Sequence, residues 1–288
     1  VRPGCAHGYN FIPQAQLDDS LETKRVQRLG LAGKISGTTG YEEDGCQGLI
    51  AGTKAALAVQ ERDQLILKRS EAYIGVLVDD LVNKGTDEPY RMFTSRAEYR
   101  ILLRQDDADL RLSPIAAELG VLNMDDRMVR VEEKKTAVDA IHRELRNHSV
   151  TPDQLNGFLE STGNTPLKQG VKLLTILSRP GISLPALAEA LPALNDFVSA
   201  YDAEMINLAE VTLKYEGYIE REKAAVEKTS RLEGIKLHSD FDYHGIGSLS
   251  LEARQKLSEL KPRTIGQASR ISGVSPADVS VLLVHLGR

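Results

Sequence analysis

Apolar positions divide the chain into a short strand-loop-helix unit near its start and a long helical remainder. Residues 29–33 form an apolar run that predicts a buried strand ending in a turn, and residues 42–59 have the period of a helix. Beyond Leu112 the sequence predicts an almost wholly helical chain, which glycines and prolines between positions 157 and 192 divide into short pieces. The pattern therefore predicts a mostly α protein.

Start and stop signals locate several of these helices. Proline suits the first turn of a helix and glycine the position after its end, so Ser113 and Pro114 predict a start and Gly120 an end. A helical stripe follows, made of Met128, Val131, Lys135, Val138, Ile141 and Leu145. Residues from about Phe197 to Ser230 keep the same spacing and predict one long helix.

Capping boxes mark three further helix starts, each with a hydroxyl side chain followed three residues later by Gln or Asp. They are Thr151 with Gln154, Thr264 with Gln267, and Ser275 with Asp278. The last two frame a helix-turn-helix outline within residues 261–286. Its second helix begins with Ala277, Asp278 and Ser280 rather than with base-reading side chains, so we expect a docking module and not a DNA reader.

The loop between the predicted strand and helix carries a specific local pattern. It reads Gly-Thr-Thr-Gly-Tyr-Glu-Glu over residues 37–43, in which Thr39 and Glu42 have the spacing of a capping box. Glycines at 45, 48 and 52 share one face of the following helix, which lets another backbone or a flat ring approach closely. These residues alone leave two interpretations open: tight packing of a βα unit, or contact with a cofactor ring.

A second informative block lies between residues 65 and 112. Arginines there are interleaved with aromatic and acidic residues: Arg91, Arg96, Arg100, Arg104 and Arg111 lie among Tyr90, Phe93, Tyr99, Glu98, Asp106, Asp107 and Asp109. Arginine grips phosphate bidentately and stacks on bases, as aromatic rings also do, so the block is suited to RNA. The alternative is that Arg96, Arg100 and Arg104, four residues apart, lie along one solvated or carboxylate-paired helix face.

Composition indicates a soluble intracellular protein. The 288 residues are 41% hydrophobic and 27% charged, with a net charge of -5 and no tryptophan. No apolar run approaches the roughly 20 residues that span a bilayer, and no secretory h-region is recognisable. This length suffices for two or three small domains.

Cysteine and histidine offer no disulfide or metal chemistry in this sequence. Cys5 and Cys46 have no Cys or His partner at ligand spacing, and the proximity of Cys5 to His7 does not by itself make a nucleophile and base. The other histidines show no metal-ligand spacing: His142, His148, His238, His244 and His285. We therefore predict no metal site. The chain also lacks the G-x-G-x-x-G pattern that seats a dinucleotide pyrophosphate on a helix N-terminus.

Several segments together resemble one family, the MnmG (GidA) enzymes that modify uridine in tRNA. The matching segments are residues 34–43, 47–52, 75–81, 88–100, 109–112, 214–219 and 265–274. The first two are similar to the second flavin-binding segment of the family, and the next two are similar to its signature. The resemblance therefore runs essentially from end to end.

The resemblance implies both a fold and a set of partners. The chain is then the carboxyl-terminal half of a longer enzyme: the remnant of an α/β FAD-binding domain followed by an all-helical carboxyl-terminal domain. The family uses FAD, NADH and methylenetetrahydrofolate, acts on tRNA with the GTPase MnmE, and is homodimeric and cytoplasmic. Its catalytic cysteines lie outside this chain, so we expect this part alone to be inactive and to hold flavin poorly.

Residue roles follow from the same resemblance, position by position. The expected FAD contacts are Gly33, Lys34, Gly37, Thr38, Thr39, Gly40, Tyr41 and Glu42. The expected RNA contacts are Arg91, Arg96 and Arg100. Because Glu42 and Glu43 repel a phosphate at the helix start, we expect the loop to contact the N1–C2=O edge of the flavin ring. Departures from the family pattern cluster in this flavin segment, at Asn10, Lys34 and Cys46.

The expected domains are residues 1–62 for the end of the FAD-binding domain, 63–112 for a bridging segment with the arginines, 113–210 for a helical subdomain, and 211–288 for a helical subdomain that binds partner and tRNA. A different class of function stays open, namely a tRNA- and partner-binding module without catalysis. The folate-dependent tRNA methyltransferase TrmFO shares the flavin architecture but lacks the long helical end, so it ranks lower.

Overall fold

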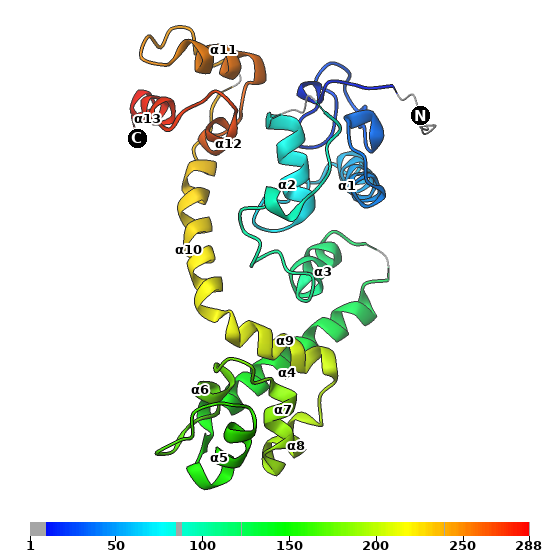
Figure 1. Ribbon diagram of the computed structural model, residues 1–288. Coiled ribbons are helices and arrows are strands. Elements are labelled where there is room, and N and C mark those ends of the chain that lie inside the picture. The colour runs from blue at the N-terminus through cyan, green and yellow to red at the C-terminus, as the bar shows by residue number, and fades with distance from the viewer. Residues whose placement is uncertain (1–9, 85–87, 122, 239, 288) are drawn as a thin grey trace, which may run out of the picture. The chain divides into compact units, whose positions relative to one another are not determined.

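Helices form almost all of the regular structure in the computed structural model of the protein, which describes residues 10–84, 88–121, 123–238 and 240–287 (Figure 1). Within these residues the only sheet pairs β1 (Ser149–Val150) with β2 (Val171–Lys172), antiparallel. The mostly α fold expected from the sequence is confirmed. None of the helices in this part of the chain is both long enough and apolar enough to cross a bilayer.

The α-helices are α1 (Tyr41–Val59), α2 (Tyr73–Asp79), α3 (Ala108–Glu118), α4 (Asp125–Asn147), α5 (Pro152–Ser161), α6 (Leu173–Leu177), α7 (Leu184–Glu189), α8 (Pro192–Val198), α9 (Ala203–Lys214), α10 (Glu216–Glu233), α11 (Leu251–Leu260), α12 (Ile265–Arg270) and α13 (Pro276–His285). Three short 3-10 helices are η1 (Gln14–Gln16), η2 (Lys34–Ser36) and η4 (Thr94–Arg96), and η3 (Asp80–Lys84) is a π-helical turn that continues α2.

The chain divides into two compact units. Unit 1 comprises residues 1–103 with 222–288, and unit 2 comprises residues 104–221, so the division falls within α10. Unit 1 contains separate hydrophobic clusters in its amino-terminal and carboxyl-terminal parts, whereas unit 2 is built around one larger cluster. The four domains expected from the sequence stay predictions.

The strand predicted over residues 29–33 is not formed, so that prediction is wrong. The segment contributes one isolated bridge, between Gly30 and Glu22, and Leu29 is 43% exposed. Its partner is a tight turn and not an extended neighbour, so no ladder of hydrogen bonds can continue along it. An apolar run alone therefore did not specify a buried strand here.

Helix α3 of unit 2 begins before the predicted start at Ser113. Its first residue is Ala108, and Pro114 lies inside the helix. Gly120 adopts a φ of +79°, in the left-handed region, just after the helix, as expected for its terminator. The Ser-Pro pair was therefore a misleading start signal, because a proline within a short helix removes only one backbone donor.

Helix α4 carries the predicted apolar stripe, with one change of register. Lys134 and not Lys135 lies on the buried face, where its side chain is 1% exposed. Its ammonium is 2.8 Å from carboxylate oxygens of Asp109 and of Glu204, so the charge is paired on both sides. Helix α4 packs against α3 and α9 along this face. The pattern of apolar positions could not predict which lysine is buried, because a buried lysine depends on carboxylates elsewhere in the chain.

The single long helix predicted from Phe197 is interrupted twice, so that prediction is wrong. The chain leaves helical geometry after α8, and Asp202 then caps α9 by accepting a 2.9 Å hydrogen bond from the N–H of Met205. Tyr215 separates α9 from α10. Three helices therefore share what looked like one periodic stripe, because periodicity persists across short breaks.

The carboxyl-terminal module, residues 235–287 of unit 1, is organised by capped helices around its own hydrophobic cluster. The Ser275–Asp278 capping box is confirmed, as is the Thr151–Gln154 box of unit 2. Thr264 caps α12 by accepting from the N–H of Gln267, whose own side chain instead accepts from Arg263. Asp278 also accepts a 2.8 Å hydrogen bond from the N–H of Ser250, which joins the starts of α11 and α13.

Asp278 generates a pH-dependent prediction. Its carboxylate is 4% exposed, and although burial favours the neutral form, hydrogen bonds from Ser250 and Ser275 outweigh burial and lower its pKa to about 2. A lowered folded-state pKa contributes stability above the ordinary value of 3.8, and that stability is lost as the pH falls through about 2. We expect Asp278→Asn to reduce the free energy of unfolding at pH 7 by about 1–2 kcal/mol, the usual magnitude for a cap.

Urea unfolding followed by circular dichroism at several pH values checks this prediction. The difference between wild type and Asp278→Asn should shrink between about pH 4 and pH 2. Asp196→Asn, an exposed aspartate in α8, is the control and should show no such trend. A difference that stays constant down to pH 2 would contradict the assigned role of the carboxylate.

Candidate functional site

The loop that precedes α1 is organised by the buried amide of Gln47, which is 0% exposed. Its Oε1 accepts from the N–H of Gly33 at 3.2 Å and from the hydroxyl of Ser36 at 3.0 Å, while its Nε2 donates to Oγ1 of Thr38 at 2.9 Å. Thr38 in turn donates to Asp44 at 2.6 Å. The inner side of the loop is therefore satisfied within the protein, and only its outer side is free to meet a ligand.

Helix α1 starts differently from the predicted capping box, which is wrong. Gly40 is the N-cap residue, and the Thr39 hydroxyl turns away to the carbonyl of Tyr90. Glu43, and not Glu42, reaches back, and it accepts a 2.9 Å hydrogen bond from the N–H of Met92. A Cβ at position 40 would lie 1.6 Å from Oε2 of Glu43, so only glycine leaves room for this carboxylate.

The outer side of the helix start presents unpaired donors. In the residues that the structure describes, the N–H groups of residues 41–43 have no acceptor, as is usual for the first turn of a helix. Tyr41 and Glu42 are exposed beside them. The glycine face of α1 is open: a Cβ at Gly45, Gly48 or Gly52 would meet nothing within 4 Å. The arrangement can accept a flat group with a hydrogen-bond acceptor on its edge.

Tyr90 brings this loop together with residues 91–100, the arginine segment, which carries Arg91, Arg96 and Arg100. Its N–H donates to the carbonyl of Gly37 at 2.7 Å, and its carbonyl accepts from the N–H of Thr39 at 3.0 Å. The two chain segments thus pair in parallel at Thr38 and Tyr90. Two blocks about 50 residues apart in the sequence, both singled out by their patterns, are thus joined by backbone hydrogen bonds in unit 1.

Beneath these joined blocks lies a cluster of buried charges around Arg69, which sequence reasoning missed. The Arg69 side chain is 8% exposed, and its guanidinium forms ion pairs with Asp79 at 2.9 Å, Asp80 at 2.7 Å and Glu98 at 2.8 Å. Burial alone would lower the pKa of Arg69, but these carboxylates outweigh it and raise that pKa. The Tyr90 hydroxyl donates to Asp80 at 2.9 Å, which ties the cluster to the loop.

The three arginines predicted to bind RNA are found in different states. Arg96 stacks on the Tyr90 ring, 4.4 Å from its centroid, and donates to the carbonyl of Arg91 at 2.9 Å. Arg91 and Arg100 are exposed, and neither has an ion pair within the described ranges. Residues 97–103 form turns and no α-helix, so the alternative of a single helix face through positions 96, 100 and 104 is wrong.

The acidic residues of the block neutralise other cations. Asp107 pairs with Arg104 at 3.1 Å and with Arg111 at 2.9 Å, so carboxylate pairing does hold for these two arginines of unit 2. Glu98 pairs with Arg69, and Asp109 with Lys134. The positive charges of Arg91 and Arg100 are therefore left uncompensated by the carboxylates that accompany them in the sequence.

Aromatic residues of the block divide in the same way. Tyr90 is fully buried and cannot stack on a base, whereas Phe93 is 54% exposed. Tyr99 uses its hydroxyl to donate to Thr229 at 3.0 Å. Farther along, the rings of Tyr215 and Tyr218 are 45% and 53% exposed, so neither is buried in a helical core.

Comparison with known proteins assigns the chain. Three family descriptions match successive parts of it: glucose inhibited division protein A over residues 1–63, the C-terminal helical domain of the tRNA-modifying enzyme MnmG/GidA over 125–223, and the C-terminal helical bundle of that enzyme over 225–288. The chain belongs to the MnmG/GidA family.

Individual relatives agree with this assignment. A protein of Cytophaga hutchinsonii named tRNA uridine 5-carboxymethylaminomethyl modification enzyme MnmG is 52% identical over 287 residues, which is 100% of this chain and 46% of the relative. A protein of Bacteroides thetaiotaomicron with the same name is 52% identical over 294 residues, 47% of its length. The structure of Aquifex aeolicus GidA superposes with a TM-score of 0.78 at 37% identity, covering 96% of this chain and 43% of that one. This MnmG/GidA chain thus spans about half the length of the curated relatives it matches.

Other candidate groups of the MnmG/GidA chain show no activated chemistry. Cys46 is exposed on α1, but partial desolvation of its thiol and the nearby charge of Glu43 raise its pKa, which disfavours the reactive thiolate. Among the described residues no cluster of three His, Cys, Asp or Glu side chains is arranged to hold a metal. The pair Cys5 and His7, and the segment around them, lie outside the described residues.

The contact between Gly40 and Glu43 generates a stability prediction. We expect Gly40→Ala to lower the free energy of unfolding by about 1–3 kcal/mol, because the new Cβ displaces Glu43 and leaves the N–H of Met92 without its charged acceptor. Gly48→Ala, inside α1 with open space around it, should instead raise the free energy by about 0.5–1 kcal/mol.

Urea unfolding of both variants and of Glu43→Ala gives the answer. In a Glu43→Ala background the added cost of Gly40→Ala should vanish, since the two changes remove the same contact. Equal effects of Gly40→Ala in the two backgrounds would show that Glu43 is not what excludes a side chain at position 40.

Proposed function

We propose that this chain is part of an FAD-dependent enzyme that, with the GTPase MnmE, adds a carboxymethylaminomethyl or aminomethyl group to carbon 5 of the wobble uridine in certain tRNAs. The names of its relatives support the reaction. The observation that carries the proposal is the pairing of Tyr90 with residues 37–39, since it joins a loop suited to a cofactor edge to a segment with exposed arginines. Cofactor and RNA then meet on one surface of unit 1.

The residues at the start of α1 fit a flavin ring. The free N–H groups of residues 41–43 and the open glycine face match a flat group with an acceptor edge, whereas three acidic residues in the first turn oppose a phosphate. The N–H groups of residues 41–43 would hold the ring edge, since the N–H of Thr39 already donates to Tyr90 and Thr38 turns its hydroxyl inward. When bound, FAD supplies the redox chemistry, with NADH as reductant and methylenetetrahydrofolate as one-carbon donor.

The remaining residues expected to contact the cofactor shape the loop or flank the start of α1. Gly33 and Gly37 adopt φ values of +86° and +87°, which shape the turn of the loop, and Lys34 lies with its ammonium 5.8 Å from the centroid of the Tyr41 ring. Lys34 and Tyr41 thus flank the helix start from the loop and the helix side. We propose that the full enzyme is a cytoplasmic homodimer in which this edge completes a flavin site.

RNA contact is assigned to Arg91 and Arg100, with Phe93 as a stacking residue. Both arginines are exposed and uncompensated, and Phe93 lies between them in the sequence with its ring half exposed. Arg96 adds a positive charge to the same surface, and its stacking on the Tyr90 ring holds the arginine segment in place. This combination of exposed guanidinium groups and an exposed ring is typical of contacts to unpaired nucleotides.

Measuring tRNA affinity over a range of salt concentrations tests the RNA assignment. In the full-length enzyme, Arg91→Ala and Arg100→Ala should each weaken binding and reduce the slope of log Kd against log salt by about 0.7–1, the amount for one lost phosphate contact. Arg111→Ala is the control, because Asp107 already pairs with that arginine. Slopes unchanged from wild type in both test variants would contradict the assignment.

A non-catalytic module that binds tRNA and partner is the second candidate, favoured by the absence of a G-x-G-x-x-G pattern from this chain. Flavin absorbance of the purified full-length protein and of this chain separates the two. Yellow full-length protein that converts tRNA supports the enzyme. Full-length protein that binds tRNA and MnmE but carries no flavin would support the module.

Partner docking is assigned to the carboxyl-terminal module. Its helices are capped and its cluster is satisfied internally, yet Leu251 of α11 and Val284 of α13 are each 76% exposed. Removing the whole segment would also break its ion pairs with the rest of unit 1, including Arg270 with Asp79 at 2.8 Å. Point substitutions on its surface are therefore the sharper test.

We expect Leu251→Asp and Val284→Asp in the full-length enzyme each to weaken MnmE binding at least about tenfold, because a carboxylate would have to be desolvated in an apolar contact. Flavin content and tRNA affinity should stay at wild-type values. Val26→Asp, another exposed apolar position of unit 1, is the matched control. Native MnmE affinity in both test variants would rule out this face as the docking surface.

A further inference from the structure

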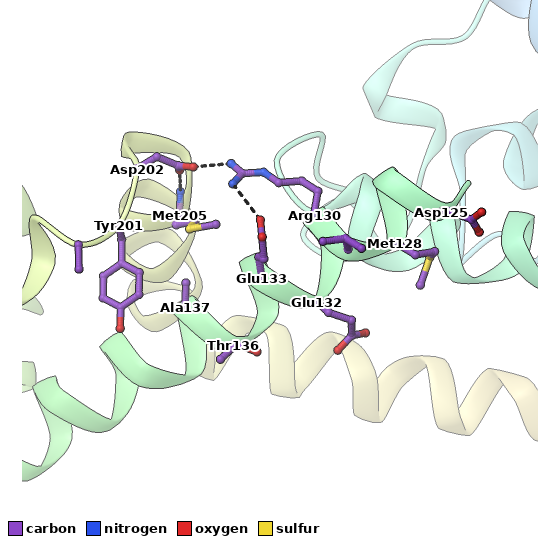
Figure 2. Close-up of a pocket in the computed structure, with 12 residues that line it drawn as sticks. Asp125, Met128, Arg130, Glu132, Glu133, Thr136, Ala137, Tyr201, Asp202 and Met205 are labelled. Carbon is purple, nitrogen blue, oxygen red and sulfur yellow. Dashed lines mark hydrogen bonds and ion pairs between the residues drawn. The ribbon is translucent and has the colours of Figure 1, made fainter. Parts of the chain in front are cut away.

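Unit 2 contains an open groove, of about 1090 Å³, that none of the roles above uses. It runs between the first half of α4 and the start of α9 (Figure 2). Apolar side chains contribute to it from both sides, with Met128 and Val129 from α4 and Tyr201 and Met205 from the other side. Val129 is 60% exposed and adds apolar surface to an otherwise polar helix face.

Acidic residues surround this apolar surface. Four carboxylates line the groove, those of Asp125, Glu132, Glu133 and Asp202, against the single guanidinium of Arg130. The N–H of Met205 lowers the pKa of Asp202, so that carboxylate stays ionised at neutral pH. The groove therefore combines an apolar surface with an excess of negative charge, which repels a phosphate backbone.

The carboxylates at the acidic end of the groove bind a guanidinium group, that of Arg130. Figure 2 shows its guanidinium reaching from α4 to the carboxylate of Asp202 and to that of Glu133, 3.9 Å away. Glu204 pairs with the same guanidinium at 3.0 Å. Three carboxylates share this arginine, and although Glu204 also pairs with Lys134 at 2.8 Å, Asp125 has no ion pair among the described residues, so the groove retains acceptors for a further cation. Arg130 itself is fully engaged and offers no charge to an anion.

We propose that this groove docks a helical segment of a partner protein that presents apolar side chains flanked by lysine or arginine. An amphipathic helix fits an apolar groove through anchors at three- and four-residue spacing. Methionine adapts its shape to such anchors, and Met128 and Met205 provide that adaptability here. Charge complementarity with the acidic border selects a basic segment and disfavours both RNA and an acidic helix. The inference does not depend on the proposed function.

Fluorescence anisotropy with two labelled peptides tests the proposal on this chain. The probe is a peptide of about 18 residues, with leucine at the anchor spacing and lysine elsewhere, long enough to become helical on binding. The comparison peptide carries glutamate in place of lysine. We expect the lysine peptide to bind at least about tenfold more tightly, and its affinity to fall with salt because the border charges are exposed.

Variants of the groove test its apolar surface and its acidic border separately. Val129→Asp should weaken the lysine peptide at least about tenfold, and Glu132→Lys with Glu133→Lys should weaken it and flatten its salt dependence. The matched controls are Val121→Asp and the double variant Glu160→Lys with Glu189→Lys, which make the same changes at exposed positions of unit 2 outside the groove. Hydrogen exchange with bound peptide should protect residues 125–137 and 200–205.

Several outcomes would overturn the proposal. The proposal is wrong if the lysine peptide binds no more tightly than the glutamate peptide, or if the groove variants and the control variants bind it equally well. Protection of residues 125–137 by tRNA instead of peptide would identify an RNA surface. A Val129→Asp variant that loses self-association, with no effect on peptide, would show that a second copy of this chain covers the groove.

Discussion

Tyr90 is the residue on which the candidate site depends. Its backbone pairs with residues 37–39, its buried ring supports the guanidinium of Arg96, and its hydroxyl donates to Asp80. A buried phenol hydroxyl needs an acceptor, and Asp80 can remain an ionised acceptor because Arg69 and Lys84 neutralise it at 2.7 and 2.8 Å. The positions of residues 37–39 and of the arginine segment are therefore set together, by Tyr90 and its charged support.

The buried charges below Tyr90 specify geometry more than they add stability. Asp79 is shared by Arg69 at 2.9 Å and by Arg270 of the carboxyl-terminal module at 2.8 Å, so one carboxylate links α2 to α12 within unit 1. The net contribution of buried ion pairs is small, but removing one partner costs about 3–5 kcal/mol. This asymmetry favours a single arrangement of the segments, as the proposed joint binding of a flavin ring and RNA would require.

Sequence reasoning succeeded where the signal was local. The α4 stripe and the Ser275–Asp278 box depend on neighbours along the chain, and the motif around residues 37–43 was recognisable by its order of residues. It failed where the partner is distant. Arg69 looks like any surface arginine until its carboxylates are placed around it, and Glu43 accepts from the N–H of Met92, which is distant in the sequence. Periodicity also could not reveal the breaks between α8, α9 and α10.

The central claim is that the loop at residues 37–43 and the arginine segment form one surface that receives the tRNA. Photocrosslinking tests it most directly, with a photoreactive phenylalanine analogue at Phe93 of the full-length enzyme bound to FAD and tRNA. The same analogue at Tyr218, an exposed ring in unit 2, is the comparison. The account predicts a crosslink from position 93 to the anticodon loop. A crosslink to that loop from position 218, with none from position 93, would contradict it.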